Sequence, residues 1–214
     1  LFAGGTGTET DPYLIKNETQ FNNIDLVDGS VKTYYKLTGD FSVSPRYLAM
    51  DFFKVANQRL QNAVLDGNNH TITVPEGNLF YITRNAVIKN LKVKDITDAL
   101  VVICYDATFD NVDVSSDYME VSNNTGAYAI YAWQDSSNAV TITFTDCDAN
   151  VKMVGGGAYN NYNAVFVGYA RGVNGGTYTT NLVFTNCTNE GSLVCGKASM
   201  FLGNVPNPTA CVVN

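Results

Sequence analysis

One short strand-like segment recurs along this chain, and its spacing restricts the possible folds more than any other feature of the sequence. In each copy an apolar residue is followed by a polar one, then by Asn or Asp, then by a second apolar residue: IKNLKV (88–93), FDNVDV (109–114), FTDCDANV (144–151) and FTNCTNEGSL (184–193). Phe109, Phe144 and Phe184 are separated by 35 and 40 residues.

A second set of segments accompanies the first at nearly the same period. These segments begin 35 residues apart, after a shorter first interval of 30: ALVVI (99–103), AIYAW (129–133), AVFVG (164–168) and SMFLG (199–203). Two kinds of strand that alternate at a near-constant period are typical of a solenoid. Stacked in parallel about 4.8 Å apart, such strands satisfy one another's backbone groups and bury one column of side chains.

The content of the repeating unit indicates the type of solenoid. The unit has no long amphipathic helical pattern and no leucine-rich signature, which excludes helical and leucine-rich repeats. Charged residues make up only 15% of the chain, so Asn, Thr, Ser, Gly and Tyr must supply the polar surface, and this mixture favours strands and turns. The sequence therefore predicts an all-β fold, a parallel β-helix with long turns.

The repeats also predict which side chains share a column. The three repeated Phe rings are expected to stack inside the coil. Asn111, Asp146 and Asn186 are expected to form a polar column in which Asn amides connect successive coils, imperfectly at Asp146. Cys147 and Cys187 share one register, and we expect both to be reduced because side chains stacked on parallel strands point the same way.

The length of 214 residues favours a single domain, 1–214. We divide it into an N-terminal cap, irregular first coils, regular coils and a C-terminal closure: 1–30, 31–64, 65–203 and 204–214. Asn17 to Gln20 form a capping box, followed by two apolar residues at helical spacing. This predicts a short helix at about 17–26 that covers the open end of the coil. The segment 44–62 fits either a helix or strands.

Charge and cysteine content exclude several classes of partner and cofactor. The net charge of −7, with no basic stripe, argues against nucleic acid, whose phosphates favour clustered Lys and Arg. Apolar runs such as 99–104 are far shorter than the roughly 18 residues that cross a bilayer, so no membrane span is predicted. Five cysteines without C-x-x-C spacing and a single His predict free buried thiols, no metal site and no cofactor.

The sequence supports no catalytic residue. The densest acidic stretch contains Asp106, Asp110, Asp113, Asp117 and Glu120. Asp110 and Asp113 have opposite parity in a regular strand and are expected to point to opposite sides of the sheet. We interpret this stretch as solvated acids, with a calcium site as the alternative. Arg84 and Arg171 have no acidic partner at repeat spacing, and His70 alone does not support a Ser–His–Asp or Cys–His site.

A binding surface has more support. The turns that follow the AIYAW-type strands are expected to emerge on one side of the coil, at 133–138, 169–181 and 203–210. Sugar rings stack on aromatic faces while their hydroxyls pair with amides. These turns are therefore a candidate glycan-binding surface, with Trp133, Tyr169, Arg171 and Tyr178 as its contact residues. A second candidate at the opposing corner comprises Tyr118, Tyr159 and Tyr162. The alternative is that these tyrosines only pack over the coil and fill turns.

The front of the chain, AGGTGTETDPYLI (3–15), resembles the N-terminal region of bacterial cell-surface proteins that leads into a right-handed β-helix, often with GLUG-type repeats. The matching residues are Gly4, Gly5, Gly7, Thr8, Asp11, Pro12, Tyr13 and Ile15, then Tyr34, Tyr35, Leu37 and Asp40. LDGNNHTIT (65–73) and AVIKNLKV (86–93) are similar to coil segments of these proteins, and AVFVGYA (164–170) with LVFTNCTNEGSL (182–193) is similar to the GLUG form.

This resemblance implies a pectin-lyase-like, right-handed parallel β-helix in an exported protein, located extracellularly or at the bacterial cell surface. It implies little chemistry, because this fold carries both enzymes and inert stalks. We expect a non-catalytic binding or adhesion module whose partner is a glycan or a host or cell-surface protein. The alternatives are a lyase or glycoside hydrolase that acts on acidic polysaccharide, and a structural spacer of a larger surface protein.

Overall fold

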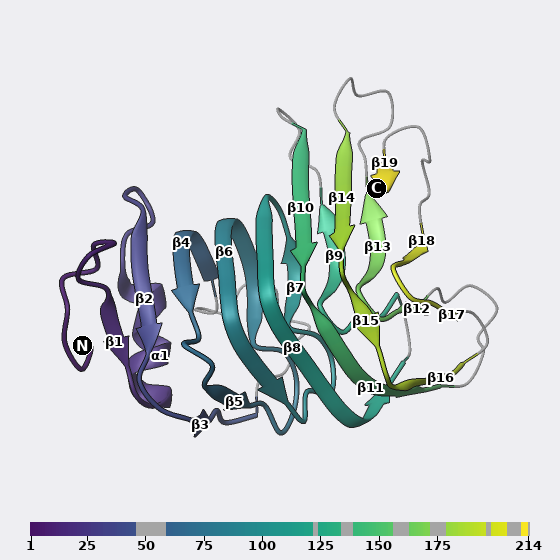
Figure 1. Cartoon of the computed structure of the whole chain (residues 1–214), viewed down its shortest axis with the longest axis horizontal. Helices are drawn as coiled ribbons and strands as arrows, with labels where there is room; N and C mark the ends of the chain where they lie inside the picture. Colours follow the sequence, from purple (N-terminus) through teal and green to yellow (C-terminus); the bar gives the residue numbers. More distant parts are fainter. Residues whose placement is uncertain are drawn as a thin grey trace.

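The computed structural model describes residues 1–45, 59–121, 124–133, 139–155, 163–171, 179–195, 198–204 and 211–213, with only the backbone described for residues 171 and 211–213. The chain winds as a coil of short strands, and every strand pairing is parallel (Figure 1). The predicted parallel β-helix is confirmed.

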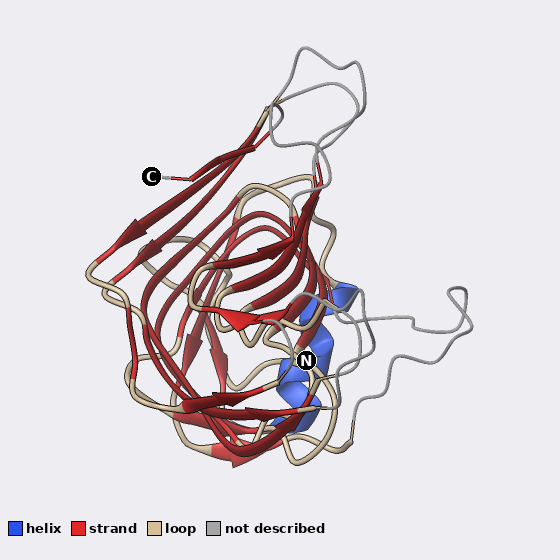
Figure 2. Cartoon of the chain, turned by 90° about the vertical axis from the view of Figure 1, so that its right-hand side faces the viewer, coloured by secondary structure: helices blue, strands red, loops and turns tan. Residues whose placement is uncertain are grey.

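The coil has three sides (Figure 2). The first sheet is a continuous parallel ladder of eight strand segments, in the order β1 (Tyr13–Ile15), β2 (Thr33–Leu37), β4 (Arg59–Asp66), β6 (Phe80–Lys94), β8 (Ala107–Glu120), β10 (Val140–Thr145), β14 (Thr180–Thr185) and β19 (Cys211–Val213). The long strands β6 and β8 bend and continue into the second sheet, which also contains β3 (Phe41–Ser42), β5 (Thr71–Thr73), β11 (Asp148–Val154), β15 (Thr188–Asn189) and β16 (Ser192–Val194).

The third sheet closes the triangle. Its described part begins with the first residues of β4 and β6 and continues through β7 (Val101–Cys104), β9 (Ala129–Trp133), β13 (Val167–Arg171) and β18 (Leu202–Asn204). A separate two-stranded pair precedes it in the last coils, β12 (Asn163–Ala164) with β17 (Ala198–Ser199). Each full coil therefore passes through the third, first and second sheets in turn.

One residue turns the chain from the first sheet into the second. Asn90, Asn111, Asp146 and Asn186 occupy this corner in successive coils, with φ between 51° and 54°. Asn and Asp tolerate this left-handed conformation better than other residues with a side chain. The predicted polar column is present: Asn111 Nδ2 donates to Asn90 Oδ1 (2.9 Å), and Asn186 Nδ2 donates to Asp146 Oδ1 (3.0 Å). The carboxylate at Asp146 thus takes part as an acceptor.

The same corner corrects one prediction. Asp110 and Asp113 were expected on opposite sides of a sheet, but both lie on the outside of the coil, since Phe109, Val112 and Val114 fill the interior. The expectation was wrong because it assumed a straight strand, whereas the chain bends at the residue between Asp110 and Val112. The two carboxylates end up on different sheets.

Aromatic rings fill the interior in two files. Phe109 and Phe144 stack at 4.9 Å and 6°, and Phe144 and Phe184 at 4.9 Å and 4°, so the predicted file is confirmed. A second file rises from the third sheet, where Tyr128 stacks on Phe166 at 4.7 Å. The files interlock, because Tyr128 meets Phe109 and Phe144 edge to face.

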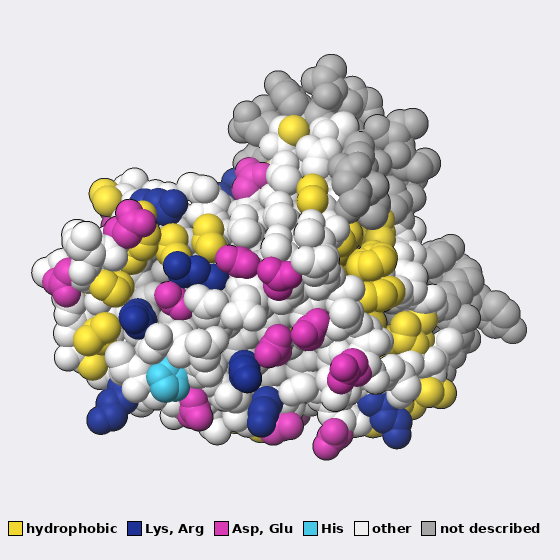
Figure 3. Space-filling view, in the orientation of Figure 1, with side chains coloured by type: hydrophobic (Ala, Val, Ile, Leu, Met, Phe, Trp, Pro, Cys, Tyr) yellow, Lys and Arg dark blue, Asp and Glu magenta, His cyan; other side chains and the backbone are white. Residues whose placement is uncertain are grey.

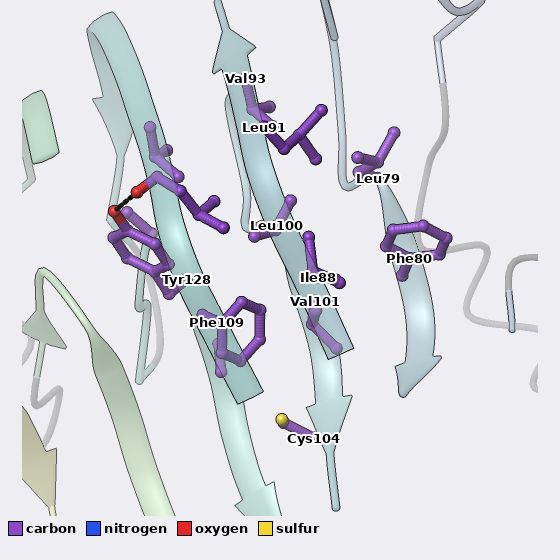
Figure 4. Packing of buried hydrophobic residues seen from close by; sticks show 14 of the residues in the cluster. Leu79, Phe80, Ile88, Leu91, Val93, Leu100, Val101, Cys104, Phe109 and Tyr128 are labelled. Atoms are coloured by element: carbon purple, nitrogen blue, oxygen red, sulfur yellow. Dashed lines mark hydrogen bonds between the residues drawn. The ribbon is translucent and has the colours of Figure 1, made fainter. Parts of the chain in front are cut away.

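The buried hydroxyl of Tyr128 crosses the interior to the second sheet. It donates to the carbonyl oxygen of Val112 at 2.6 Å, with the carbonyl oxygen of Asp148 at 3.0 Å as a second acceptor (Figure 4). A buried tyrosine normally needs such a partner for its hydroxyl. This residue therefore connects two sides of the coil.

A short helix covers part of the N-terminal end. Helix α1 (Glu18–Asn22) continues into a 3-10 turn, η1 (Asn23–Leu26), which confirms a helix in the predicted range. Asn17 Oδ1 accepts from the backbone N–H of Gln20 (3.0 Å), and Gln20 Oε1 accepts from the N–H of Lys16 (2.7 Å). Phe21 is buried, with its ring 5.4 Å from that of Phe80. Of the ambiguous segment 44–62, residues 46–58 lie outside the described part of the chain.

Candidate functional site

The outer face of the third sheet carries a cluster of aromatic side chains. In β9, Ala129 and Ala132 point into the coil, and the two residues between them, Ile130 and Tyr131, lie on the outer face. The register aligns Tyr131 with Tyr169 and Trp133 with Arg171 on the neighbouring strand. Tyr105, directly after β7, lies beside Trp133 in the same row across the strands, and Arg84 follows it in the coil before. We call Tyr105, Tyr131, Trp133 and Tyr169 the aromatic surface.

Tyr131 is in ring contact with two other members of the aromatic surface. The Tyr131 ring lies 5.9 Å from Trp133 and 5.8 Å from Tyr169, both edge to face. All four side chains of the surface remain partly exposed. The guanidinium carbon of Arg84 lies 3.9 Å from the centre of the Tyr105 ring, a cation–π contact at the N-terminal end of the row.

Three of the predicted site residues meet here. Trp133, Tyr169 and Arg171 lie on adjacent strands β9 and β13, and they belong to the strands and not to the turns after them. The register of these strands differs from the expected one by three residues, because Ala129 pairs with Val167 and not with Ala164. For Arg171 the structure describes only the backbone. The other three predicted residues fall outside the described part of the chain: Tyr159, Tyr162 and Tyr178. Tyr118 is 55% exposed on β8, away from this cluster.

Sequence reasoning missed Tyr105, Tyr131 and Arg84 as members of the cluster. The signal was present, because Tyr131 lies two residues before Trp133 in the same short strand. In a strand of that length, residues two apart lie on one face. The predicted surface includes only Trp133 from this strand, as the first residue of the following turn, and leaves out the outward position of Tyr131.

The single His of the chain forms a small surface pair. His70 Nδ1 lies 3.0 Å from Asp40 Oδ1, and this carboxylate also accepts from the backbone N–H of Thr71 at 2.9 Å. The Thr71 bond first, and then the His70 contact, lower the pKa of Asp40. The pair fixes the turn before β5.

The thiols have the properties of core residues. Cys104, Cys147 and Cys187 carry free thiols, and burial raises the pKa of Cys104 and of Cys147 to about 12. Since the thiolate is the reactive form, these two sulfur atoms are protonated and unreactive near neutral pH.

Charged residues on the second sheet form a row across the strands. Burial raises the pKa of Asp113, the nearby Lys92 lowers it and Asp148 raises it.

Within the described ranges, no group of three or more His, Cys, Asp or Glu is arranged to hold a metal ion. No helix in the part of the chain that the structure describes is long and apolar enough to span a membrane.

Comparison with known proteins supports the fold. No protein-family model matches the sequence, and no curated protein matches it. Among solved structures, the chain is similar to a Bacteroides ovatus protein provisionally named an immunoglobulin A1 protease, with a TM-score of 0.72 at 16% identity. The similarity covers 99% of this chain and 66% of that protein, so this chain spans slightly less than two thirds of its length. At this identity the comparison establishes the shared fold alone.

Proposed function

We propose that this chain is a non-catalytic binding module of an exported bacterial surface protein, and that it recognises glycans through the aromatic surface. The observation that carries this proposal is the contact of Tyr131 with Trp133 and Tyr169 on two adjacent parallel strands. Aromatic faces bind the apolar faces of sugar rings, and rings on a paired sheet lose little conformational freedom on binding.

Polar groups beside the rings suit the hydroxyls of a sugar. Asn204 of β18 is in register with Tyr169, and the Arg84 guanidinium lies at the opposite end beside Tyr105. These amide and guanidinium groups lie at the two ends of the aromatic surface, in neighbouring rows, and can orient a short oligosaccharide along the axis of the coil. The resemblance of the N-terminal segment to bacterial cell-surface proteins supports an extracellular location.

Glycan binding by the wild type and by single-site variants tests the proposal. We expect Trp133→Ala and Tyr131→Ala each to weaken binding about tenfold, because each loses a stacking contact of about 1.4 kcal/mol. Tyr118→Ala removes an exposed tyrosine from the second-sheet part of β8 and tests the second candidate surface, and binding through the aromatic surface predicts that this variant keeps the wild-type affinity. A glycan array identifies the ligand, and calorimetry then measures its affinity for each variant.

Unchanged affinity in both aromatic variants would remove the aromatic surface from the function. The same samples are incubated with uronic acid polymers, with and without calcium, and with glycoprotein. New reducing ends, unsaturated products or cleaved polypeptide would replace the binding proposal with an enzymatic one.

A further inference from the structure

A groove of about 610 Å³ lies on the outer face of the first sheet, at its N-terminal end and away from the aromatic surface. Its floor is a row of outward side chains on neighbouring strands, in which Tyr34, Val64 and Val87 are in register. In the next two coils the same row holds Thr108 and Thr143. The continuous apolar stretch of this row, Tyr34, Val64 and Val87, therefore ends where the two threonines follow.

The wall of the groove is a loop held rigidly by backbone hydrogen bonds. Glu9, Thr10 and Pro12 line the groove from this loop. The N–H of Tyr34 donates to the carbonyl of Gly7 (2.9 Å), and the N–H of Gly7 donates to the carbonyl of Asp11 (2.9 Å). Gly7 has a φ of 82°, and a Cβ there would lie 2.4 Å from the Tyr13 ring, so this close packing requires glycine.

Lysines surround the apolar floor. Lys32, Lys36 and Lys89 all line the groove, although the protein as a whole carries a net charge of −7. Figure 3 shows Lys and Arg side chains next to hydrophobic ones over the strands of the first coils. Lys32 Nζ lies 5.8 Å from the centre of the Tyr34 ring, which forms part of the floor.

The one acid of the floor is engaged within the protein. Asp66 Oδ1 accepts from the N–H of Asn68 (2.8 Å) and from Asn90 Nδ2 (3.2 Å), while its Oδ2 lies 3.7 Å from Lys89 Nζ. These contacts offset much of the negative charge of Asp66. Glu9 in the wall is the second acid of the lining, so three lysines against two acids give the groove a net charge of +1, which attracts anions.

We infer that this groove binds an acidic peptide segment that carries an aliphatic side chain. The branched aliphatic floor suits a Leu or Ile side chain, whereas sugar rings bind best to aromatic planes flanked by amides. Strands β2 and β4 are paired on both sides within the sheet, so the segment cannot add as a further strand. Recognition must come from side chains, with the lysine ammonium groups bound to carboxylates and the floor bound to the aliphatic group.

The inference is independent of the glycan proposal and is tested separately. The probes are three fluorescein-labelled peptides of equal length: one of alternating Asp and Leu, one with Lys in place of Asp, and one with Ser in place of Leu. Fluorescence anisotropy at low and high salt measures their affinity for the wild-type protein. We expect only the Asp–Leu peptide to bind, and to bind less tightly as salt screens the lysines.

Two variants locate the binding. Lys36→Glu should lower the affinity for the Asp–Leu peptide about fivefold at low salt. Lys152→Glu makes the same change at an exposed position of β11 and should change the affinity less than about twofold. The double variant Val64→Thr, Val87→Thr gives the floor the residue of the later coils and should weaken binding about fivefold.

Several outcomes would overturn the inference. These are no binding of the Asp–Leu peptide up to about millimolar concentration, equal binding of all three peptides, or equal effects of Lys36→Glu and Lys152→Glu. Preferential binding of an oligogalacturonide at this groove would instead assign it to an acidic saccharide. Circular dichroism confirms that each variant retains the wild-type fold.

Discussion

At the scale of single residues, the fold depends on a few positions where the backbone conformation and the hydrogen bonds require one kind of side chain. The corner between the first and second sheets needs a residue that tolerates a positive φ and also bonds to the coil before it. Asn meets both needs, because its amide donates to the side-chain oxygen of its predecessor while its backbone adopts the left-handed conformation. Corner residues therefore contribute to stability although several are exposed.

Substitution of Asn111 separates these two contributions. Asn111→Gly keeps the backbone relaxed and loses the amide bond, so we expect a loss of about 1 kcal/mol in the free energy of unfolding. Asn111→Ala adds the strain of a positive φ and should cost about 2 kcal/mol or more. Asn150→Ala, at an exposed strand position, is the control. Equal losses for Gly and Ala in urea denaturation would contradict the strain argument.

The buried thiols make stability depend on alkaline pH. The thiols of Cys104 and Cys147 have a folded-state pKa of about 12, above that of a thiol in the unfolded chain, so the folded state retains protons that the unfolded state releases. Their contribution is complete below about pH 8.5 and is lost as pH rises toward 12. We expect the free energy of unfolding to fall across this window, and less steeply in the double variant Cys104→Ala, Cys147→Ala.

Thiol titration checks the same point independently. Near pH 8, Cys104 and Cys147 should not react with an aromatic disulfide reagent in the native protein, and should react fully in guanidinium chloride. Rapid modification of Cys104 in the native state would show that this part of the core opens. The more exposed Cys187 serves as the internal reference.

At the scale of elements, each strand gains most of its stability from the copies before and after it. Phe144 is fully buried between two parallel rings, whereas Phe184 near the end of the file is only partly buried. The packing energy of equivalent residues should therefore depend on their position in the stack.

Truncation of the two rings measures this dependence. Phe144→Ala should lower the free energy of unfolding by about 3–5 kcal/mol, because it leaves a cavity inside two interlocked files. Phe184→Ala should cost about 2 kcal/mol, since its neighbourhood is more open. Chemical denaturation of both variants gives the comparison, and equal losses would argue against a graded stack.

Strand stacking was predictable from the sequence because it requires only spacing. The intervals between Phe109, Phe144 and Phe184 fix which residues share a file, whatever the turns between them do. The outward positions were harder to predict. Val64 and Val87 look like core residues by composition, yet they form the floor of a groove, because a three-sided coil buries only one face of each sheet.

At the scale of the whole molecule, the coil places two different surfaces on one rigid body. The aromatic surface lies on the third sheet, and the groove lies on the first sheet at the N-terminal end. Sequence reasoning placed Trp133, Tyr169 and Arg171 on one side of the coil, although the expected interval of 35 residues between these strands was wrong: Trp133 is in register with Arg171, 38 residues later, because the turns between the strands vary in length. It could not find the groove, since the loop at 3–12 belongs to no repeat and meets the sheet only in three dimensions.

The corner residues have a consequence for how such a chain can diversify. In the four coils that carry an Asn or Asp corner at Asn90, Asn111, Asp146 or Asn186, the turn from the first sheet into the second keeps one length. By contrast, two residues separate Cys104 from Ala107 and six separate Trp133 from Val140. Length variation is therefore tolerated where the third sheet meets the first, next to the aromatic surface. Evolution, or a combinatorial library, can lengthen and reshuffle that one junction to acquire new specificities while every stacked ring and amide stays in register.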